Sequence, residues 1–143
     1  MEKKIRILNS IIILLFSFCI IEAKEYKDEI EDFKIIKVRD GGTFVITIPN
    51  IPDVFGEEIA VRVRGIDTPE KRDEREEIKA IAYKAQEELE KLLMSGEKVI
   101  LYNLGRDKYF RLLASVKVGN IDVSKYMIDK GLAKKYDGGR KQW

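Results

Sequence analysis

The sequence contains no histidine among its 143 residues. This absence excludes catalytic arrangements that need an imidazole, such as a Ser-His-Asp triad or a histidine general base, and it excludes His-ligated zinc. Cys19 is the only cysteine, so cysteine-rich zinc sites and internal disulfides are excluded as well. An active site in this chain must therefore rely on carboxylates, lysine, arginine, tyrosine, hydroxyls and backbone groups.

The chain also has little net charge, although charged residues are abundant. They make up 36% of the sequence, yet the formal net charge is only +2. Basic residues gather in 62–64, 106–111 and 134–141, while acidic residues dominate 25–32 and 73–90. This segregation predicts a local positive field for a polyanion despite the near-neutral total.

The first 23 residues differ in composition from the rest. Lys3, Lys4 and Arg6 precede an apolar run over 11–21, and Ala23 offers a small residue at a cleavage site. This pattern predicts a signal peptide over 1–23 and a secreted or periplasmic protein. The alternative is a protein anchored to the membrane by an uncleaved signal.

The rest of the chain predicts one mixed α+β domain over 33–136, between a flexible leader at 24–32 and an irregular tail at 137–143. An apolar stripe at helical spacing predicts a long helix over 74–94, and a second helix is expected over 122–130. Alternating β-branched residues predict the strands. The order favours a five-stranded OB-fold Greek-key barrel, with the long helix after the third strand and a shorter C-terminal helix. The expected strands are 33–38, 43–48, 59–66, 98–102 and 111–118.

Three short clusters carry the candidate chemistry. Each cluster alone has an ordinary explanation as a solvated strand face, a helix start or a turn. In their order and spacing they resemble the staphylococcal nuclease (thermonuclease) family, over about residues 35–136. The clusters are Asp40-Gly-Gly-Thr43, Arg62-x-Arg64-Gly-Ile-Asp67-Thr68-Pro69-Glu70 and Asp107-Lys108-Tyr109-Phe110-Arg111.

The resemblance implies a calcium-dependent enzyme that hydrolyses DNA and RNA phosphodiesters by direct attack of water. Arg62 and Arg111 align with two arginines that stabilise the transition state, and guanidinium forks suit the charge that builds on phosphate oxygens. Glu70 aligns with the carboxylate that positions or deprotonates the water. In a chain without histidine, a carboxylate is the available base.

The remaining aligned positions concern the metal and the substrate. Asp67 and the carbonyl of Thr68 are the implied oxygen ligands of Ca²⁺. Lys108, Tyr109 and Tyr136 resemble positions that hold the phosphate and base of the substrate. We expect a monomer with no stable protein partner, acting on nucleic acid and preferring single strands.

The first cluster departs from the family, which has Asp-Gly-Asp-Thr there. Gly42 stands where the family has a second metal-binding aspartate, and the loss of a carboxylate should weaken the site. Three outcomes are open: Asp40 substitutes as a ligand, water fills the vacancy, or the protein is an inactive OB-fold module that binds single-stranded nucleic acid. A further departure is Phe110, where the family often has glycine.

Overall fold

The computed structural model describes residues 28–141 and 143. The predicted signal peptide, 1–23, and the start of the predicted leader, 24–27, lie outside the described residues. Within the described residues, no helix combines the length and the apolar character needed to span a bilayer.

Five long strands form the body of the sheet, in the order β6-β7-β4-β3-β2. Neighbours are antiparallel except for β4 and β7, which run parallel with Val61 opposite Leu112. These strands correspond to the five predicted ones, within a few residues at each end. They are β2 (Lys34–Asp40), β3 (Thr43–Thr47), β4 (Ile59–Val63), β6 (Val99–Arg106) and β7 (Leu112–Val118).

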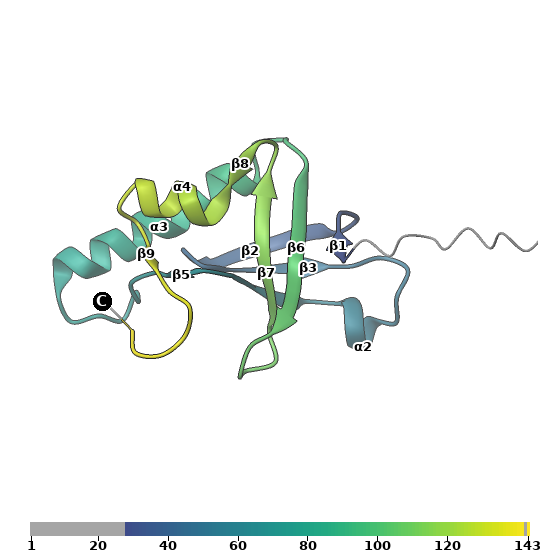
Figure 1. Cartoon of the computed structure of the whole chain (residues 1–143), viewed down its shortest axis with the longest axis horizontal. Coiled ribbons are helices and arrows are strands. Elements are labelled where there is room, and N and C mark those ends of the chain that lie inside the picture. The colour runs from purple at the N-terminus through teal and green to yellow at the C-terminus, as the bar shows by residue number, and fades with distance from the viewer. Residues whose placement is uncertain (1–27, 142) are drawn as a thin grey trace, which may run out of the picture.

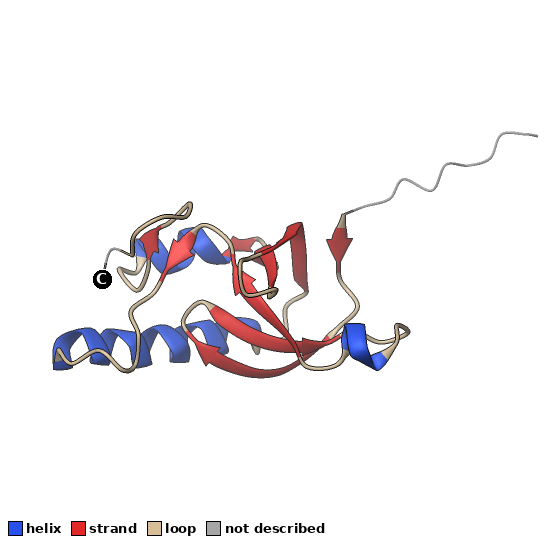
Figure 2. Cartoon of the chain, turned by 90° about the horizontal axis from the view of Figure 1, so that it is seen from below, coloured by secondary structure: helices blue, strands red, loops and turns tan. Residues whose placement is uncertain are grey.

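Two helices cover one end of the sheet, and the mixed α+β prediction is confirmed (Figures 1 and 2). Helix α3 (Glu76–Leu93) is the predicted long helix, and its apolar stripe is buried at Ala82, Ala85, Leu89, Leu92 and Leu93. Helix α4 (Val123–Asp129) is the shorter C-terminal one; the Asp122 side chain accepts a hydrogen bond from the Lys125 amide at its start. The one-turn helix α2 (Asp53–Gly56), a segment for which no helix was predicted, lies at the opposite end.

The hydrophobic core lies between the sheet and the two helices. Phe44, Val45 and Ile46 of β3, which lies between β2 and β4 in the sheet, are fully buried. The turn between β2 and β3 packs directly on α3. A Cβ on Gly41 would come within 2.5 Å of the Ala85 Cβ, so only glycine allows this close approach. The turn that carries Asp40 is therefore anchored to the core.

The third predicted strand, 59–66, is not continuous. The strand breaks after Val63, and Gly65 adopts a left-handed φ of 85°. The chain resumes as β5 (Ile66–Asp67), which pairs with β9 (Lys134–Lys135) in a separate two-stranded sheet. The prediction was wrong here because the alternating pattern continues through a turn that only glycine permits. The break redirects Asp67 away from the main sheet.

The other short strands belong to segments that were not predicted as strands. Strand β1 (Glu29–Ile30) pairs with β6, so part of the expected flexible leader is held on the sheet edge. Strand β8 (Ile121–Asp122) pairs with β7. Two-residue pairings of this kind have too few side chains to produce a readable pattern in the sequence.

Candidate active site

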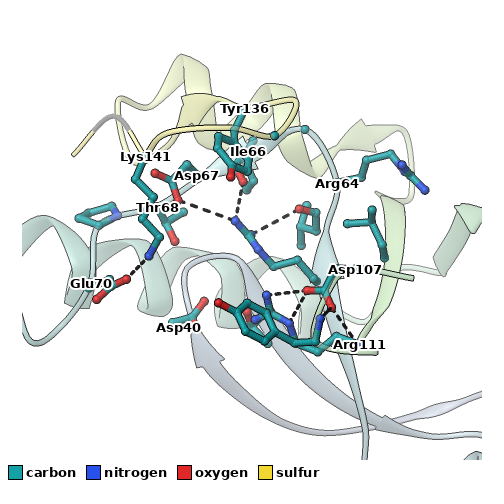
Figure 3. A pocket seen from close by; sticks show the side chains of 18 of the residues that line it. Asp40, Arg64, Ile66, Asp67, Thr68, Glu70, Asp107, Arg111, Tyr136 and Lys141 are labelled. Atoms are coloured by element: carbon teal, nitrogen blue, oxygen red, sulfur yellow. Dashed lines mark hydrogen bonds and ion pairs between the residues drawn. The ribbon is translucent and has the colours of Figure 1, made fainter. Parts of the chain in front are cut away.

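The site is a pocket of about 1360 Å³. Its walls come from the β2–β3 turn, the segment from β4 to residue 72, the loop between β6 and β7, and residues 135–141 (Figure 3). The structure brings all nine predicted site residues to this pocket, although their roles stay predictions. They are Asp40, Arg62, Asp67, Thr68, Glu70, Lys108, Tyr109, Arg111 and Tyr136.

Positive charge dominates the pocket. Nine lysines and arginines line it, against five aspartates and glutamates. The local excess of four positive charges exceeds the net charge of +2 on the whole chain, which matches the segregation expected from the sequence. A cleft with this balance raises the local concentration of a polyanion.

Arg62 is the most deeply anchored cation of the pocket. Its Nη1 donates to the carbonyl oxygens of Gly42 (3.2 Å) and Val63 (3.4 Å), and its Nη2 donates to that of Ile66 (2.7 Å). The side chain is only 15% exposed, and Nη2 lies 3.9 Å from Asp67 Oδ1. Burial lowers the pKa of Arg62 from its ordinary value, while the Asp40 charge acts in the opposite direction. Three carbonyls therefore fix the direction of the guanidinium.

The Arg62 guanidinium occupies the space that a side chain at position 42 would need. A Cβ on Gly42 would lie 2.3 Å from Arg62 Nη1. A contact of that length is impossible for real atoms, so any side chain at position 42 must displace the guanidinium. The inward conformation of Arg62 therefore depends on the glycine at position 42.

Asp67 supplies the buried carboxylate. Its Oδ2 is buried without a hydrogen-bond partner among the described residues, and Oδ1 is near Arg62. An unpartnered buried oxygen costs free energy unless a cation or water satisfies it. Thr68, which follows it, is also buried. This orphaned oxygen fits a hard cation such as Ca²⁺.

The remaining carboxylates give that cation few further ligands. Asp40 Oδ1 accepts a hydrogen bond from the Gly42 amide (2.8 Å). Within the described part of the chain, no group of three or more Asp, Glu, His or Cys side chains is arranged to hold a metal. The donor set is therefore Asp67 and the backbone at Thr68, with Asp40 across the pocket (Figure 3).

Arg111 is held by a carboxylate instead of by carbonyls. Its Nε and Nη2 lie 2.7 and 2.6 Å from Asp107 Oδ2. Asp107 Oδ1 accepts from the amides of Tyr109 (2.8 Å) and Arg111 (3.0 Å). Burial raises the pKa of Asp107, but the bonds from the Arg111 side chain and from these amides outweigh it, so the net pKa lies below the ordinary value.

The loop that carries Lys108 and Tyr109 is open to solvent. The Tyr109 side chain is largely exposed, and the Lys108 ammonium and Arg111 guanidinium lie 5.1 and 5.4 Å from its ring centroid. These distances are typical of cation–π contacts. Phe110, next in the chain, is also exposed and adopts a left-handed backbone conformation.

The C-terminal segment crosses the pocket. The Tyr136 amide donates to the Gly65 carbonyl (2.9 Å), so the segment is attached beside β5. Lys141 forms an ion pair with Glu70, and Trp143 Nε1 donates to the Asp67 carbonyl (3.0 Å). Residues that were expected as an irregular tail therefore contact two of the predicted site residues. Figure 3 shows the pair of Lys141 and Glu70.

The comparison with known proteins identifies the domain. The profile of the staphylococcal nuclease homologue family matches residues 60–142, more than half of the chain. The chain belongs to this family. The match covers Arg62, Asp67, Glu70 and Arg111, which confirms the resemblance seen in the sequence.

A curated relative of this chain is a longer protein. An uncharacterized 38.1 kDa protein of Capnoides sempervirens is 29% identical to the chain over 99 residues. These residues are 69% of this chain and 27% of that protein, so the chain spans about a quarter of the length of the curated relative that it matches.

Three residues that contact the site had no partner predicted from the sequence: Asp107, Lys141 and Trp143. Asp107 belongs to the third cluster, with turn chemistry as its ordinary explanation, but it was given no partner, although its spacing of four from Arg111 was a usable signal. Lys141 and Trp143 lie more than 70 residues from their partners Glu70 and Asp67, and no local pattern predicts such a contact.

Proposed function

We propose that this protein is a nuclease that hydrolyses phosphodiester bonds in DNA and RNA by direct attack of water. The carrying observation is the convergence of Arg62, Glu70 and Arg111 on one positively charged pocket, beside the unpartnered oxygen of Asp67. Each group alone has an ordinary structural explanation. Together they supply the charge stabilisation and the base that such a reaction requires.

The two arginines act on the phosphate. Arg111 lies in the pocket with a side chain that is still partly accessible, and the more deeply buried Arg62 provides a second fixed positive charge in the same pocket. Preorganised charges stabilise the trigonal-bipyramidal transition state without reorganisation cost. Glu70, an exposed carboxylate at the start of the segment that leads into α3, accepts the proton of the attacking water.

Calcium is the proposed cofactor, because the family typically depends on it and Asp67 fits it. Asp67 and the carbonyl of Thr68 would hold the ion, with Asp40 nearby, and the ion would neutralise charge on the phosphate. The donor set has one carboxylate fewer than the family pattern. We therefore propose weaker calcium binding than a complete aspartate pair would give.

A second candidate function is binding of single-stranded nucleic acid without cleavage. The observation that favours it is the state of Arg62, whose Nη atoms donate to three backbone carbonyls instead of pointing a free fork at a substrate. In this alternative the pocket still attracts the phosphate backbone. The two candidates differ in product formation, which is directly measurable.

The deciding experiment is digestion of heat-denatured DNA and of RNA by the full chain, with calcium and with a chelator. We expect calcium-dependent fragments, and loss of most activity in Glu70→Gln. Glu90→Gln on the exposed face of α3 is the control and should cleave normally. Retained binding without any product, in protein whose folding is verified by circular dichroism, would overturn the nuclease and favour the binding module.

We also propose a monomeric OB-fold barrel that is exported after cleavage of residues 1–23. The strand order and the parallel β4–β7 pair support the barrel. Cross-strand NOEs between β2 and β6 would establish closure of the barrel, and their absence would leave an open sheet.

N-terminal sequencing of exported protein would locate the cleavage, and sedimentation would give the oligomeric state.

A further inference from the structure

Phe110 combines an unfavourable backbone with an exposed ring. Its φ is 61°, in the left-handed region, and its side chain is 79% exposed. Among the described residues, the other non-glycine residues at positive φ are two asparagines and a glutamate. Asparagine tolerates this conformation, whereas a bulky aromatic residue there is an outlier.

The loop geometry explains the conformation but not the residue. Asp107 fixes the turn: its carbonyl accepts from the Phe110 amide (3.0 Å), and its carboxylate holds Arg111. The Phe110 carbonyl in turn accepts from Arg106 Nη1 (2.8 Å). Glycine would satisfy the same bonds without strain. The phenyl ring buries little of its area against the rest of the described chain, so packing does not compensate for the strain.

The surroundings of the ring point to its use. Tyr109 on one side is exposed and carries two cations over its ring, Lys108 and Arg111. Arg106, which donates to the Phe110 carbonyl, adds a third cation to the loop. Two neighbouring exposed aromatic rings among positive charges match the requirements of an unpaired nucleic-acid strand, whose bases stack while its phosphates meet the cations.

We propose that Phe110 is a base-stacking residue that extends the pocket along a single strand. The ring contacts a nucleobase next to the phosphate at Arg111, and the strained backbone holds the ring outward where a base reaches it. This role favours unpaired strands, because a base inside a duplex has no free face. The inference rests on the proposed nucleic-acid substrate; the alternative occupant, an apolar surface of a protein, becomes an outcome of the test.

The test separates stacking from backbone binding. Fluorescence polarisation measures binding of the full chain to a phosphorothioate oligothymidylate, which resists cleavage, and to an abasic phosphorothioate strand of equal length, with calcium and with chelator. We expect Phe110→Gly to weaken binding of the thymidylate by about tenfold and to leave the abasic strand unchanged. The midpoint temperature of thermal unfolding should rise in Phe110→Gly, because glycine adopts this backbone conformation without strain.

The matched control is Phe55→Ala, which removes an exposed aromatic ring from α2, an element that contributes no described residue to the pocket. It should leave both affinities unchanged. Equal binding of the thymidylate by Phe110→Gly and wild type, or equal weakening for both strands, would overturn the stacking role and leave a protein contact as the use of the ring. If wild type binds neither strand with or without calcium, the proposed nucleic-acid function itself fails.

Discussion

The two walls of the pocket differ in burial and in the groups that hold their charged side chains. The β4–β5 wall is buried, and its charged groups are held by backbone atoms: Arg62 donates to three carbonyls and lies near Asp67. The β6–β7 loop is exposed, and its groups are held by one carboxylate, that of Asp107. The difference teaches that the first wall holds its charges in fixed directions, whereas the second presents exposed cationic and aromatic side chains to solvent.

The largest effect is expected from Arg62→Ala on the buried wall. Removing the guanidinium leaves buried carbonyls and the Asp67 carboxylate unpaired, which should cost about 3–5 kcal/mol of unfolding free energy. Nuclease activity should fall by about 10²–10³-fold, as for other preorganised charges. Urea unfolding and DNA digestion measure the two effects, and Arg62→Lys, which keeps the charge, shows how much of the activity loss is geometry.

The comparison variant is Arg64→Ala, two residues along the chain. Its guanidinium donates to the exposed Asn103 carbonyl, so its loss should cost about 1 kcal/mol or less. If the two arginines contribute equally to stability, burial of the Arg62 guanidinium and its three carbonyl partners do not explain the contribution of Arg62.

The second effect concerns the space at Gly42. Gly42→Ala places a Cβ against Arg62 Nη1, so the guanidinium must leave the buried carbonyls that it bonds, and the loss of these bonds should destabilise the fold by about 1–3 kcal/mol. In the Arg62→Ala background the same change should cost much less, because the opposing atoms are gone. A double-mutant cycle of urea unfolding measures this coupling; additive costs would show that the two positions do not compete for space.

The third effect tests the carboxylate that organises the exposed wall. The pKa of Asp107 is lowered from 3.8, so its stabilisation is complete above pH 3.8 and is lost as the pH falls through the lower folded-state value. Asp107→Asn should cost about 1.5–3 kcal/mol near pH 7, since it weakens a bond to a charged group. The deficit relative to wild type should shrink below pH 3.8, as measured by urea unfolding at several pH values.

A matched carboxylate outside the pocket is Asp73, whose pKa is lowered to about 2 by the side-chain hydrogen bond from Arg75. Asp73→Asn should also flatten the acid dependence of stability. Only Asp107→Asn should change affinity for an oligonucleotide, because only Asp107 positions Arg111. Equal binding changes in both variants would remove Asp107 from the site.

The smallest effect is expected from Lys141→Met, in the segment that crosses both walls. The Lys141 and Glu70 side chains are 59% and 62% exposed, so their ion pair contributes little to stability. Releasing the proposed base should raise the nuclease rate about twofold at low salt, and the gain should vanish near 1 M salt, where the pair is screened. Lys125→Met, which removes an exposed ion pair with Asp129 in α4, should leave the nuclease rate unchanged both at low salt and near 1 M salt.

Much of the fold follows from local patterns. The apolar stripe of α3 has the helical period, and the five long strands alternate or are β-branched, so period alone predicts them. The break at Gly65 was not predictable in this way. Whether an alternating run continues as one strand depends on its partners, and here β5 leaves the main sheet to pair with β9, about 70 residues later.

The candidate site divides in the same way. The order of the three clusters predicted which residues meet, and all nine line one pocket. Their internal pairings were not visible, because they depend on side-chain directions set by packing. The inward turn of Arg62 needs the empty space at Gly42, and the contacts of Lys141 and Trp143 need the C-terminal segment to return across the pocket.

The amino-acid composition decided which chemical groups this protein can use: without histidine, and with a single cysteine in the N-terminal segment, an active site is limited to carboxylates, lysine, arginine, tyrosine, hydroxyls and backbone groups. The tertiary structure decided where these groups lie and which neighbours hold them. In the sequence, Gly42 stands where the family has a metal-binding aspartate. In the structure, the absence of a side chain at Gly42 leaves room for the Arg62 guanidinium. The reason is physical, since residue type sets what a group can do, whereas packing sets which neighbour it meets.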